Sequence, residues 1–413
     1  MNQHSDAPAT VTVVGIGADG WAGLGESARE LIRQAPLVIG GHRQQTLLPD
    51  IPGQDRRRWP TPLLPSLRAL LDEYHGRPIL VVASGDPLLS GIGSTLVEML
   101  GAAAVRIVPA VSSETLARAR MGWSAESVDV LTTVGRDPHA VLAALSPGRR
   151  LVVLSSDEHS PSRLAGLLVD AGYGGSEMTV LGNLGSGDET SETRPAADWT
   201  DAAAPRLNVV CLDLRADAGA ALLPSVPGLP DDAFEHDGQL TKRDLRASAL
   251  SRLAPVPGQL LWDVGAGAGS VAIEWARADP RCRAIAVEQH PDRADRIARN
   301  AQRLGVPGVR VVAGNAPAAL ADLPRPDAVF VGGGAGVPGV LDSCWEAIRP
   351  AARLVVHAVT IETEALLVHW FQTHGGELVR LSVERAEPLG SFTGWTPART
   401  ITQWSITKTE ESV

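Results

Sequence analysis

The sequence predicts an α/β protein made of two domains, and three observations support this. The chain has 413 residues, more than one ordinary domain requires. Short β-branched runs alternate with longer mixed segments on both sides of residues 215–238. That stretch is itself rich in Ala, Asp, Pro and Gly, a composition typical of a linker. We therefore place a first domain at 10–214, a linker at 215–238 and a second domain at 239–408.

The expected strands of the first domain are short aliphatic or β-branched runs, most of them bounded by Gly or Pro. The longer segments between them leave room for helices. These strands are Thr10–Val14, Pro36–Ile39, Ile79–Ala83, Val105–Val108, Leu151–Leu154, Met178–Leu181 and Leu207–Leu212.

The second domain repeats the alternation after residue 239. Thr241 could cap a helix that continues to Arg252, because apolar residues recur there at helical spacing. Segments of helical period, such as Asp292–Leu304 and Val340–Ile348, separate the later strands, which favours a mostly parallel sheet. The expected strands are Leu260–Val264, Arg283–Val287, Val309–Val312, Asp327–Val331 and Arg353–Val359.

Charge and hydropathy exclude several classes of function. The chain has 37 Lys and Arg against 47 Asp and Glu, a net charge of −10, which argues against nucleic acid as the main partner. No apolar run approaches the roughly 18 residues of a membrane-spanning helix. We therefore expect a cytoplasmic chain that neither spans a membrane nor binds nucleic acid.

Cysteine and lysine usage narrow the chemistry further. Cys211, Cys282 and Cys344 lie far apart without a CxxC pair, so we expect no metal site and a reducing compartment. Lys242 and Lys408 are the two lysines, and all other cationic residues of the Lys and Arg set are arginine. Schiff-base chemistry is therefore not expected, whereas arginine forks that recognise carboxylates are abundant.

A glycine loop in the second domain gives the strongest signal for a ligand. The expected strand Leu260–Val264 runs directly into Gly265-Ala266-Gly267-Ala268-Gly269, where alternate glycines allow a tight turn and close approach of a ligand. Ser270 stands where the dinucleotide pattern GxGxxG needs its last glycine. The carboxylate of Asp263 suits the ammonium of a methionine moiety and would repel a phosphate.

Polar residues at the next strand ends extend this pattern. Glu288 ends the following strand and could accept both ribose hydroxyls of an adenosine. Asn315 and Ala316 follow the third strand and could line an adenine pocket. Together these features predict S-adenosyl-L-methionine as the cofactor. A nucleotide-dependent dehydrogenase, or a glycine turn without a ligand, stays open as the alternative.

Glycine and polar residues also follow the strands of the first domain. Gly15 and Gly17 follow the first strand, Gly85 and Asp86 the third, and Ser112 the fourth. Ligands of open α/β sheets bind at the carboxyl ends of the strands. We therefore expect these five residues to bind the cofactor at a second site.

The chain resembles known families from about residue 10 to 405. The first domain is similar to tetrapyrrole (corrin/porphyrin) methylases in Gly15-Ile16-Gly17, Gly85-Asp86-Pro87 and Pro109-Ala110-Val111-Ser112-Ser113. The second resembles the precorrin-6B methyltransferase/decarboxylase domain in residues 241–246, 263–269, 314–317 and 329–333. The resemblance implies a two-lobed methylase fold followed by a Rossmann-like class I methyltransferase fold, and adds Thr241 to the expected cofactor-binding residues.

Fused in this order, the two domains resemble precorrin-6Y C5,15-methyltransferases (decarboxylating) of aerobic cobalamin biosynthesis. The resemblance implies methylation of precorrin-6B at C5 and C15 with decarboxylation of its C12 acetate, giving precorrin-8X. The N-terminal domain would then act on C5, and the C-terminal domain would methylate C15 and release carbon dioxide. The resemblance also implies a homo-oligomer.

Three residues are candidates for catalysis in the second domain. Methyl transfer to an enamine-like ring carbon needs alignment rather than a protein nucleophile, and no Ser-His-Asp or Cys-His set is evident. Because such a substrate has many carboxylates, Arg246 is the first candidate for a carboxylate clamp. His357 and Glu362 flank the end of the fifth strand, and either could move a proton. A structural or surface role stays open for all three, and residues 391–395 could cover the macrocycle or form a plain hairpin turn.

Two other functions stay open. One is an S-adenosylmethionine-dependent methyltransferase of RNA or protein with an N-terminal recognition module, which the acidic net charge disfavours. The other is a non-catalytic scaffold with an inactive donor site. The intact glycine loop, with Asp263 and Glu288, disfavours that interpretation for the second domain.

Overall fold

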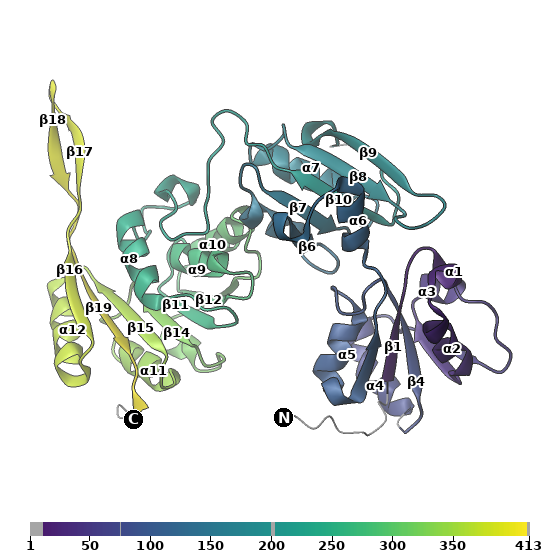
Figure 1. The fold of residues 1–413 in the computed structure, drawn as a ribbon. Helices are drawn as coiled ribbons and strands as arrows, with labels where there is room; N and C mark the ends of the chain where they lie inside the picture. Colours follow the sequence, from purple (N-terminus) through teal and green to yellow (C-terminus); the bar gives the residue numbers. More distant parts are fainter. Residues whose placement is uncertain (1–10, 75, 200–202, 411–413) are drawn as a thin grey trace. The chain divides into compact units, whose positions relative to one another are not determined.

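The computed structural model describes residues 11–410 except residues 75 and 200–202, and it divides into two compact units (Figure 1). The first unit comprises residues 1–138 and 147–220, and the second comprises residues 139–146 and 221–413. No helix of the described part of the chain is long and apolar enough to cross a membrane.

The first unit begins with a five-stranded parallel sheet in the order β3-β2-β4-β1-β5. Its central strands are buried on both faces: Val13 and Val81 pack into one apolar cluster, and Val14 and Val82 pack into another. The elements are β1 (Val11–Ile16), α1 (Gly20–Gly23), α2 (Glu26–Gln34), β2 (Leu37–Gly40), α3 (His42–Thr46), β3 (Asp55–Arg58), α4 (Leu63–Glu73), β4 (Ile79–Ser84), α5 (Ile92–Leu100) and β5 (Val105–Val108).

The second lobe of this unit is a mixed five-stranded sheet in the order β6-β7-β10-β8-β9. β6 and β7 are parallel, and the other neighbours are antiparallel. The elements are α6 (Ser113–Met121), β6 (Asp129–Thr132), β7 (Arg150–Leu154), α7 (Ser160–Asp170), β8 (Glu177–Gly182), β9 (Thr190–Pro195) and β10 (Asn208–Asp213). Two sheets in one unit form the two lobes that the family resemblance predicted.

The second unit is a seven-stranded sheet in the order β13-β12-β11-β14-β15-β19-β16, with helices on both faces (Figure 1). Five strands are parallel, and β19 runs antiparallel to both of its neighbours. The elements are α8 (Arg243–Leu253), β11 (Leu260–Val264), α9 (Ser270–Ala278), β12 (Arg283–Glu288), α10 (Pro291–Arg303), β13 (Arg310–Ala313), β14 (Ala328–Val331), α11 (Val340–Ala347), β15 (Arg353–Ala358), α12 (Ile361–His374), β16 (Glu377–Leu381) and β19 (Ile401–Thr407). The predicted fold class is confirmed.

A separate two-stranded hairpin, β17 (Glu384–Leu389) and β18 (Phe392–Pro397), extends from the edge of the second unit (Figure 1). The large apolar side chains near its tip, Leu389, Phe392 and Trp395, are exposed. The residues that the sequence assigned either to a turn or to a cover therefore form a hairpin.

The structure corrects the prediction that residues 215–238 are a linker throughout. Leu229 and Phe234 are buried in the core of the second unit. The backbone N–H groups of Gly228 and Leu229 donate to the carboxylate of Glu274, at 2.6 and 3.0 Å. The proline-rich segment forms neither an α-helix nor a strand, but it packs against the second unit, so residues 221–238 belong to that unit.

Lys408, the residue after β19, connects the end of that strand to helix α11 through hydrogen bonds. Its Nζ donates to the carbonyl oxygens of Trp345 at 2.9 Å and Ile348 at 3.2 Å, at the C-terminal end of that helix. The ammonium also lies 4.9 Å from the centre of the Trp345 ring. Burial lowers the pKa of Lys408. The contact satisfies carbonyls that a helix end would otherwise leave unpaired.

We predict that Lys408→Met destabilises the second unit by about 1–3 kcal/mol, because two carbonyls lose a charged donor. Calorimetric unfolding of the full chain measures the shift. Lys242→Met is the matched control, since the Lys242 side chain has no partner among the described residues, and its cost should stay within about 0.5 kcal/mol. Equal stability of the two variants would show that the Lys408 contacts contribute nothing.

Candidate active sites

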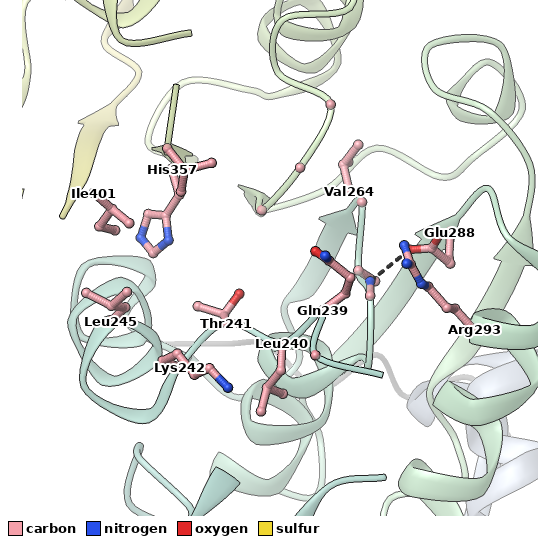
Figure 2. A pocket seen from close by; sticks show the side chains of 18 of the residues that line it. Gln239, Leu240, Thr241, Lys242, Leu245, Val264, Glu288, Arg293, His357 and Ile401 are labelled. Carbon is pink, nitrogen blue, oxygen red and sulfur yellow. Dashed lines mark hydrogen bonds between the residues drawn. The ribbon is translucent and has the colours of Figure 1, made fainter. Parts of the chain in front are cut away.

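A cavity of about 660 Å³ lies at the carboxyl ends of the parallel strands of the second unit (Figure 2). Each of four neighbouring strands supplies part of its wall. Gly265 follows β11, Glu288 ends β12, Gly333 follows β14, and His357 lies at the end of β15. This is the edge of an open α/β sheet where ligands bind, because helix N-termini and loops converge there.

The loop after β11 requires glycine for steric reasons. Gly265 and Gly267 have φ values of +69° and +60°, which side chains disfavour. A Cβ at Gly265 would lie 2.5 Å from the carbonyl oxygen of Gly333, and a Cβ at Gly267 would lie 2.8 Å from that of Gln239. The backbone can therefore form the cavity wall itself. Ala266, which the sequence assigned to cofactor binding, also lines the cavity.

The rest of the glycine loop supports this wall from behind. Gly269 caps α9 in the left-handed region, and a Cβ there would lie 2.6 Å from Cγ2 of Ile297. Ala268 is fully buried, and its carbonyl oxygen accepts a hydrogen bond from Nδ2 of Asn300 at 3.0 Å. Ala268 and Gly269 do not line the cavity. They therefore serve the turn and are not part of the cavity surface.

Two carboxylates lie at the acidic end of the site. Glu288 accepts hydrogen bonds from the N–H of Gly267 at 2.8 Å, the dashed line of Figure 2, and from the N–H of His290 at 3.0 Å. Asp263 is buried behind the cavity, where its Oδ2 accepts from the N–H of Ala272 at 3.0 Å. Burial and the nearby charge of Glu288 raise the pKa of Asp263 to about 7.

The other predicted cofactor-binding residues divide into two groups. Thr241 and Ala316 line the cavity. Asn315 is exposed and lies outside the lining, so the structure does not bring it to the site. A residue at a strand end can face either the cavity or the solvent, and the sequence does not distinguish the two.

His357 lines the cavity in a neutral form. Its Nε2 lies 2.9 Å from Oε1 of Gln403, and its ring packs edge-on against Phe330 with a centroid separation of 4.9 Å. Burial lowers the pKa of His357 to about 4. At neutral pH the imidazole is therefore uncharged and only weakly basic, so it can take part in hydrogen bonds but supplies no positive charge. Gln403 comes from β19, a strand that the sequence did not predict.

The structure contradicts the prediction that Arg246 clamps a substrate carboxylate. Arg246 is fully buried, and its Nε donates to Oε1 of Glu274 at 2.5 Å while Nη1 lies 3.2 Å from Oδ1 of Asp231. The guanidinium also donates to the carbonyl oxygens of Thr241 and Leu229. With its donors directed into the protein, Arg246 holds the segment before α8 in place.

Glu362 is not brought to the cavity either. It lies in the first turn of α12, is exposed, and is absent from the cavity wall. A carboxylate suits the N-terminus of a helix, because the helix dipole favours negative charge there. The sequence signal for Glu362 was its position after a strand, which also marks the start of the following helix.

Sequence reasoning missed the positive side chains of the cavity wall. They are Lys242, Arg293, Arg385 and Arg399. Arg293 pairs with Asp237 at 2.9 Å, and Arg385 pairs with Asp244 at 3.1 Å. Arg385 and Arg399 lie at the base of the hairpin. They reach the cavity because β19, the strand after the hairpin, runs antiparallel beside β15. Lys242 had one signal, since lysine is rare in this chain.

The first unit has its own cavity of about 390 Å³ at the strand ends of its parallel sheet. Gly17, Gly85, Asp86 and Ser112, four of the five residues expected to bind the cofactor here, line it together with residues of the second lobe. Gly15 lies behind the wall, where a Cβ would come within 2.1 Å of the carbonyl oxygen of Gly85. Glycine at position 15 thus permits the close approach of β1 to the turn after β4.

Two polar side chains of this cavity also serve the local fold. Asp86 Oδ1 accepts from the N–H of Leu88 at 2.9 Å, which closes the turn after β4. Ser112 Oγ accepts from the N–H of Thr115 at 3.0 Å and caps α6. Both side chains can still accept a hydrogen bond from a ligand. Their presence at these strand ends is, however, explained in part by the turn and the helix cap that they form.

Comparisons with known proteins agree with this two-part architecture. The chain matches the family of Tetrapyrrole (Corrin/Porphyrin) Methylases over residues 10–199 and the Precorrin methyltransferase domain family over residues 232–408. A precorrin-6Y C(5,15)-methyltransferase (decarboxylating) from Sinorhizobium sp is 46% identical over 398 residues, which are 96% of each chain. An enzyme of the same name from Mycobacterium tuberculosis (strain ATCC 25618 / H37Rv) is 44% identical and covers 96% of this chain and 100% of its own.

A solved structure is also similar to part of the chain. It is the C-terminal domain of precorrin-6Y C5,15-methyltransferase from Rhodobacter capsulatus, 48% identical, covering 45% of this chain and 100% of that one with a TM-score of 0.43. The resemblance predicted from the sequence motifs is confirmed over nearly the full chain by the curated relatives.

We predict that Glu274→Ala destabilises the second unit by about 3–5 kcal/mol, because Arg246 loses the fully buried one of its two carboxylate partners and the N–H groups of Gly228 and Leu229 lose their acceptor. Chemical denaturation followed by tryptophan fluorescence measures the loss. Glu362→Ala is the matched control and should cost less than about 1 kcal/mol, since that carboxylate is exposed. A small effect at Glu274 would contradict the structural role assigned to Arg246.

We also predict a pH dependence that comes from His357. The unfolded chain binds a proton at this residue below its ordinary pKa of 6.5, whereas the folded chain does so below about 4. The stability that neutral His357 contributes is therefore present above pH 6.5 and is lost as the pH falls towards 4. The wild-type melting temperature should fall more between pH 7 and pH 5 than that of His357→Gln. Parallel curves would contradict the lowered pKa.

Proposed function

This chain belongs to the family of precorrin-6Y C5,15-methyltransferases (decarboxylating), and we propose that it methylates precorrin-6B at C5 and C15. The same reaction sequence removes the C12 acetate carboxylate and gives precorrin-8X in aerobic cobalamin biosynthesis. The observation that supports this most directly is that each unit has its own cavity at the carboxyl ends of parallel strands. Two methylations at distant ring positions are consistent with two such sites.

We assign the C5 methylation to the first unit and the C15 methylation and decarboxylation to the second. The family matches support this division, since residues 10–199 match tetrapyrrole methylases and residues 232–408 match a precorrin methyltransferase domain. The relative from Pyrobaculum calidifontis is named a probable cobalt-precorrin-6B C(15)-methyltransferase (decarboxylating). It is 35% identical over 41% of this chain, so that activity can belong to a shorter protein.

S-adenosyl-L-methionine is the proposed methyl donor at both sites. In the second unit the residues fit this group: Gly265 and Gly267 leave the wall free of side chains, and Glu288 can accept hydrogen bonds from hydroxyls. Oδ1 of Asp263, buried behind this wall, has no hydrogen-bond partner among the described residues, and a negative charge there would favour a cationic group in the cavity without contacting it. The donor, when bound, supplies an electrophilic methyl group.

The chain's own contribution to catalysis is to orient the substrate and to limit its contact with water. Val264, Val287 and Leu245 give the cavity apolar walls, which strengthen electrostatic interactions inside. Proximity and orientation contribute about 7–11 kcal/mol in favourable enzymatic cases, and no protein nucleophile is needed. Gln403 holds one ring nitrogen of His357, and the uncharged ring can form a hydrogen bond to the substrate at the other; its pKa of about 4 makes it a weak base at neutral pH. Loss of carbon dioxide is favoured where a carboxylate is poorly solvated.

We further propose that the enzyme works in the cytoplasm as a homo-oligomer, as the family resemblance implied. Its three cysteines are buried and free, which is compatible with a reducing compartment. Light scattering of the purified chain measures the assembly. The mass of a monomer at working concentration would overturn the second part of this proposal.

We predict that purified chain and donor convert precorrin-6B to a product with two more methyl groups and one carbon dioxide less. Gly17→Val adds a branched side chain at a residue that lines the first cavity and must displace the Asp19 carboxylate, whose Oδ1 would lie 2.4 Å from the new Cβ, so it should abolish the C5 methylation. Gly333→Val fills the second, with its Cβ at an ordinary 3.8 Å from the nearest contact, and should abolish the C15 methylation and the decarboxylation. Mass spectrometry under anaerobic conditions distinguishes these products. An unchanged substrate with the wild type would refute the function, and wild-type products from both variants would refute the sites.

A further inference from the structure

We propose that Lys242 and Arg399 form a carboxylate-binding rim in the second unit, which positions acidic side chains of the substrate. This inference rests on the proposed function. It names the residues that would recognise the carboxylates of a tetrapyrrole substrate. Lys242 directly precedes helix α8, and Arg399 lies in the short connection between β18 and β19. Both line the cavity that holds the glycine loop.

The cavity wall is positive although the chain is acidic. Four cationic side chains, Lys242, Arg293, Arg385 and Arg399, line it against two carboxylates, Asp244 and Glu288. The whole chain has a net charge of −10. His357 adds no charge at neutral pH, because burial lowers its pKa to about 4. A local excess of positive charge in an acidic protein attracts anionic ligands to this site.

Pairing separates the four cations into two kinds. Arg293 lies 2.9 Å from Asp237, and Arg385 lies 3.1 Å from Asp244, so these two are neutralised by the protein. Within residues 11–74, 76–199 and 203–410, the side chains of Lys242 and Arg399 have no ion-pair or hydrogen-bond partner. An unpaired lysine and an unpaired arginine in one cavity wall are available to a ligand with two or more carboxylates.

The contacts of the hairpin base place these cations on one rim. The N–H of Ala398 donates to the carbonyl oxygen of Val383 at 2.8 Å, which closes the hairpin next to Arg399. The ion pair of Arg385 with Asp244 links the hairpin to the first turn of α8, two residues beyond Lys242. The rim is therefore fixed by two elements that are far apart in sequence.

The rim also lies on the side of the cavity opposite its acidic end. Figure 2 shows Lys242 and Leu245 on the same side as His357 and Ile401, with Glu288 and Arg293 on the other side. Ile401 follows Arg399 by two residues, at the start of β19. A donor at the glycine loop and Glu288 would leave this side for the acidic substrate. The neutral imidazole of His357 would then face the substrate.

The test is steady-state kinetics of carbon dioxide release from precorrin-6B, which reports on the second unit of the full chain. Arg399→Gln and Lys242→Gln should each raise the KM about tenfold or more, since each removes a charged hydrogen-bond partner. Their affinity for S-adenosylhomocysteine, measured by calorimetry, should stay within about twofold. Arg399→Lys should recover part of the loss, because it keeps the charge without the fork.

The dependence of kcat/KM on salt concentration provides a second readout, because two residues with a merely structural role would not cause such a dependence. The kcat/KM of the wild type should fall as ionic strength rises, and the double variant Lys242→Gln/Arg399→Gln should lose most of that dependence. Arg349→Gln is the matched control. Arg349 is exposed and lies in the turn before β15, at the amino end of that strand, whereas the cavity lies at the carboxyl ends. This variant should keep wild-type KM and salt dependence.

The outcomes separate this inference from the proposed function. A wild type that neither methylates nor decarboxylates precorrin-6B overturns the function itself. An active wild type with unchanged KM in both single variants overturns the rim alone. An equal loss of affinity for S-adenosylhomocysteine in Arg399→Gln would likewise overturn it, because the substitution would then have disturbed the donor site.

Discussion

The buried carboxylate of Glu274 is the interaction on which the second site depends. It accepts hydrogen bonds from the N–H groups of Gly228 and Leu229 and from the guanidinium of Arg246. These partners come from the segment before α8 and from α8 itself, while Glu274 belongs to α9. One carboxylate therefore fixes an irregular segment against the helix that follows the glycine loop. This anchor positions residues 238–242, 244 and 245, which form one wall of the cavity.

The glycine loop is the complementary constraint, because it sets how closely the cavity wall can approach a ligand. Its backbone touches the loop after β14 at a distance that leaves no space for a Cβ at Gly265. Glu288 holds the N–H of Gly267, so the second strand of the sheet stabilises the turn of the first. The N–H groups of Gly265 and Ala266 also donate to the carbonyl oxygen of Val287, at 2.9 and 3.1 Å, and a wall preorganised in this way favours alignment of reactants.

The sequence predicted those parts of the molecule whose residues act locally. The buried strand Leu260–Val264 was predicted with its observed bounds, because a central parallel strand is apolar on both faces. The strand Asp55–Arg58 was missed, since its four residues are charged, and β17 and β18 were missed because their side chains are exposed. Arg246 was misinterpreted because its partner Glu274 is distant in sequence. His357 was placed correctly at a strand end, but its neutral state depends on burial that only the packed sheet creates.

The position of β19 has a consequence for how the enzyme is made. This strand lies between β15 and β16, although both precede it in the chain. During synthesis the ribosome releases β15, α12, β16 and the hairpin before the strand that joins β15 to β16, so the place between these two strands stays unfilled until β19 emerges. Arg399, Ile401 and Gln403 arrive with this last strand. Domains fold in order as they leave the ribosome. The first unit can thus complete its cavity early in translation, whereas the second site forms only after nearly the whole chain has been translated.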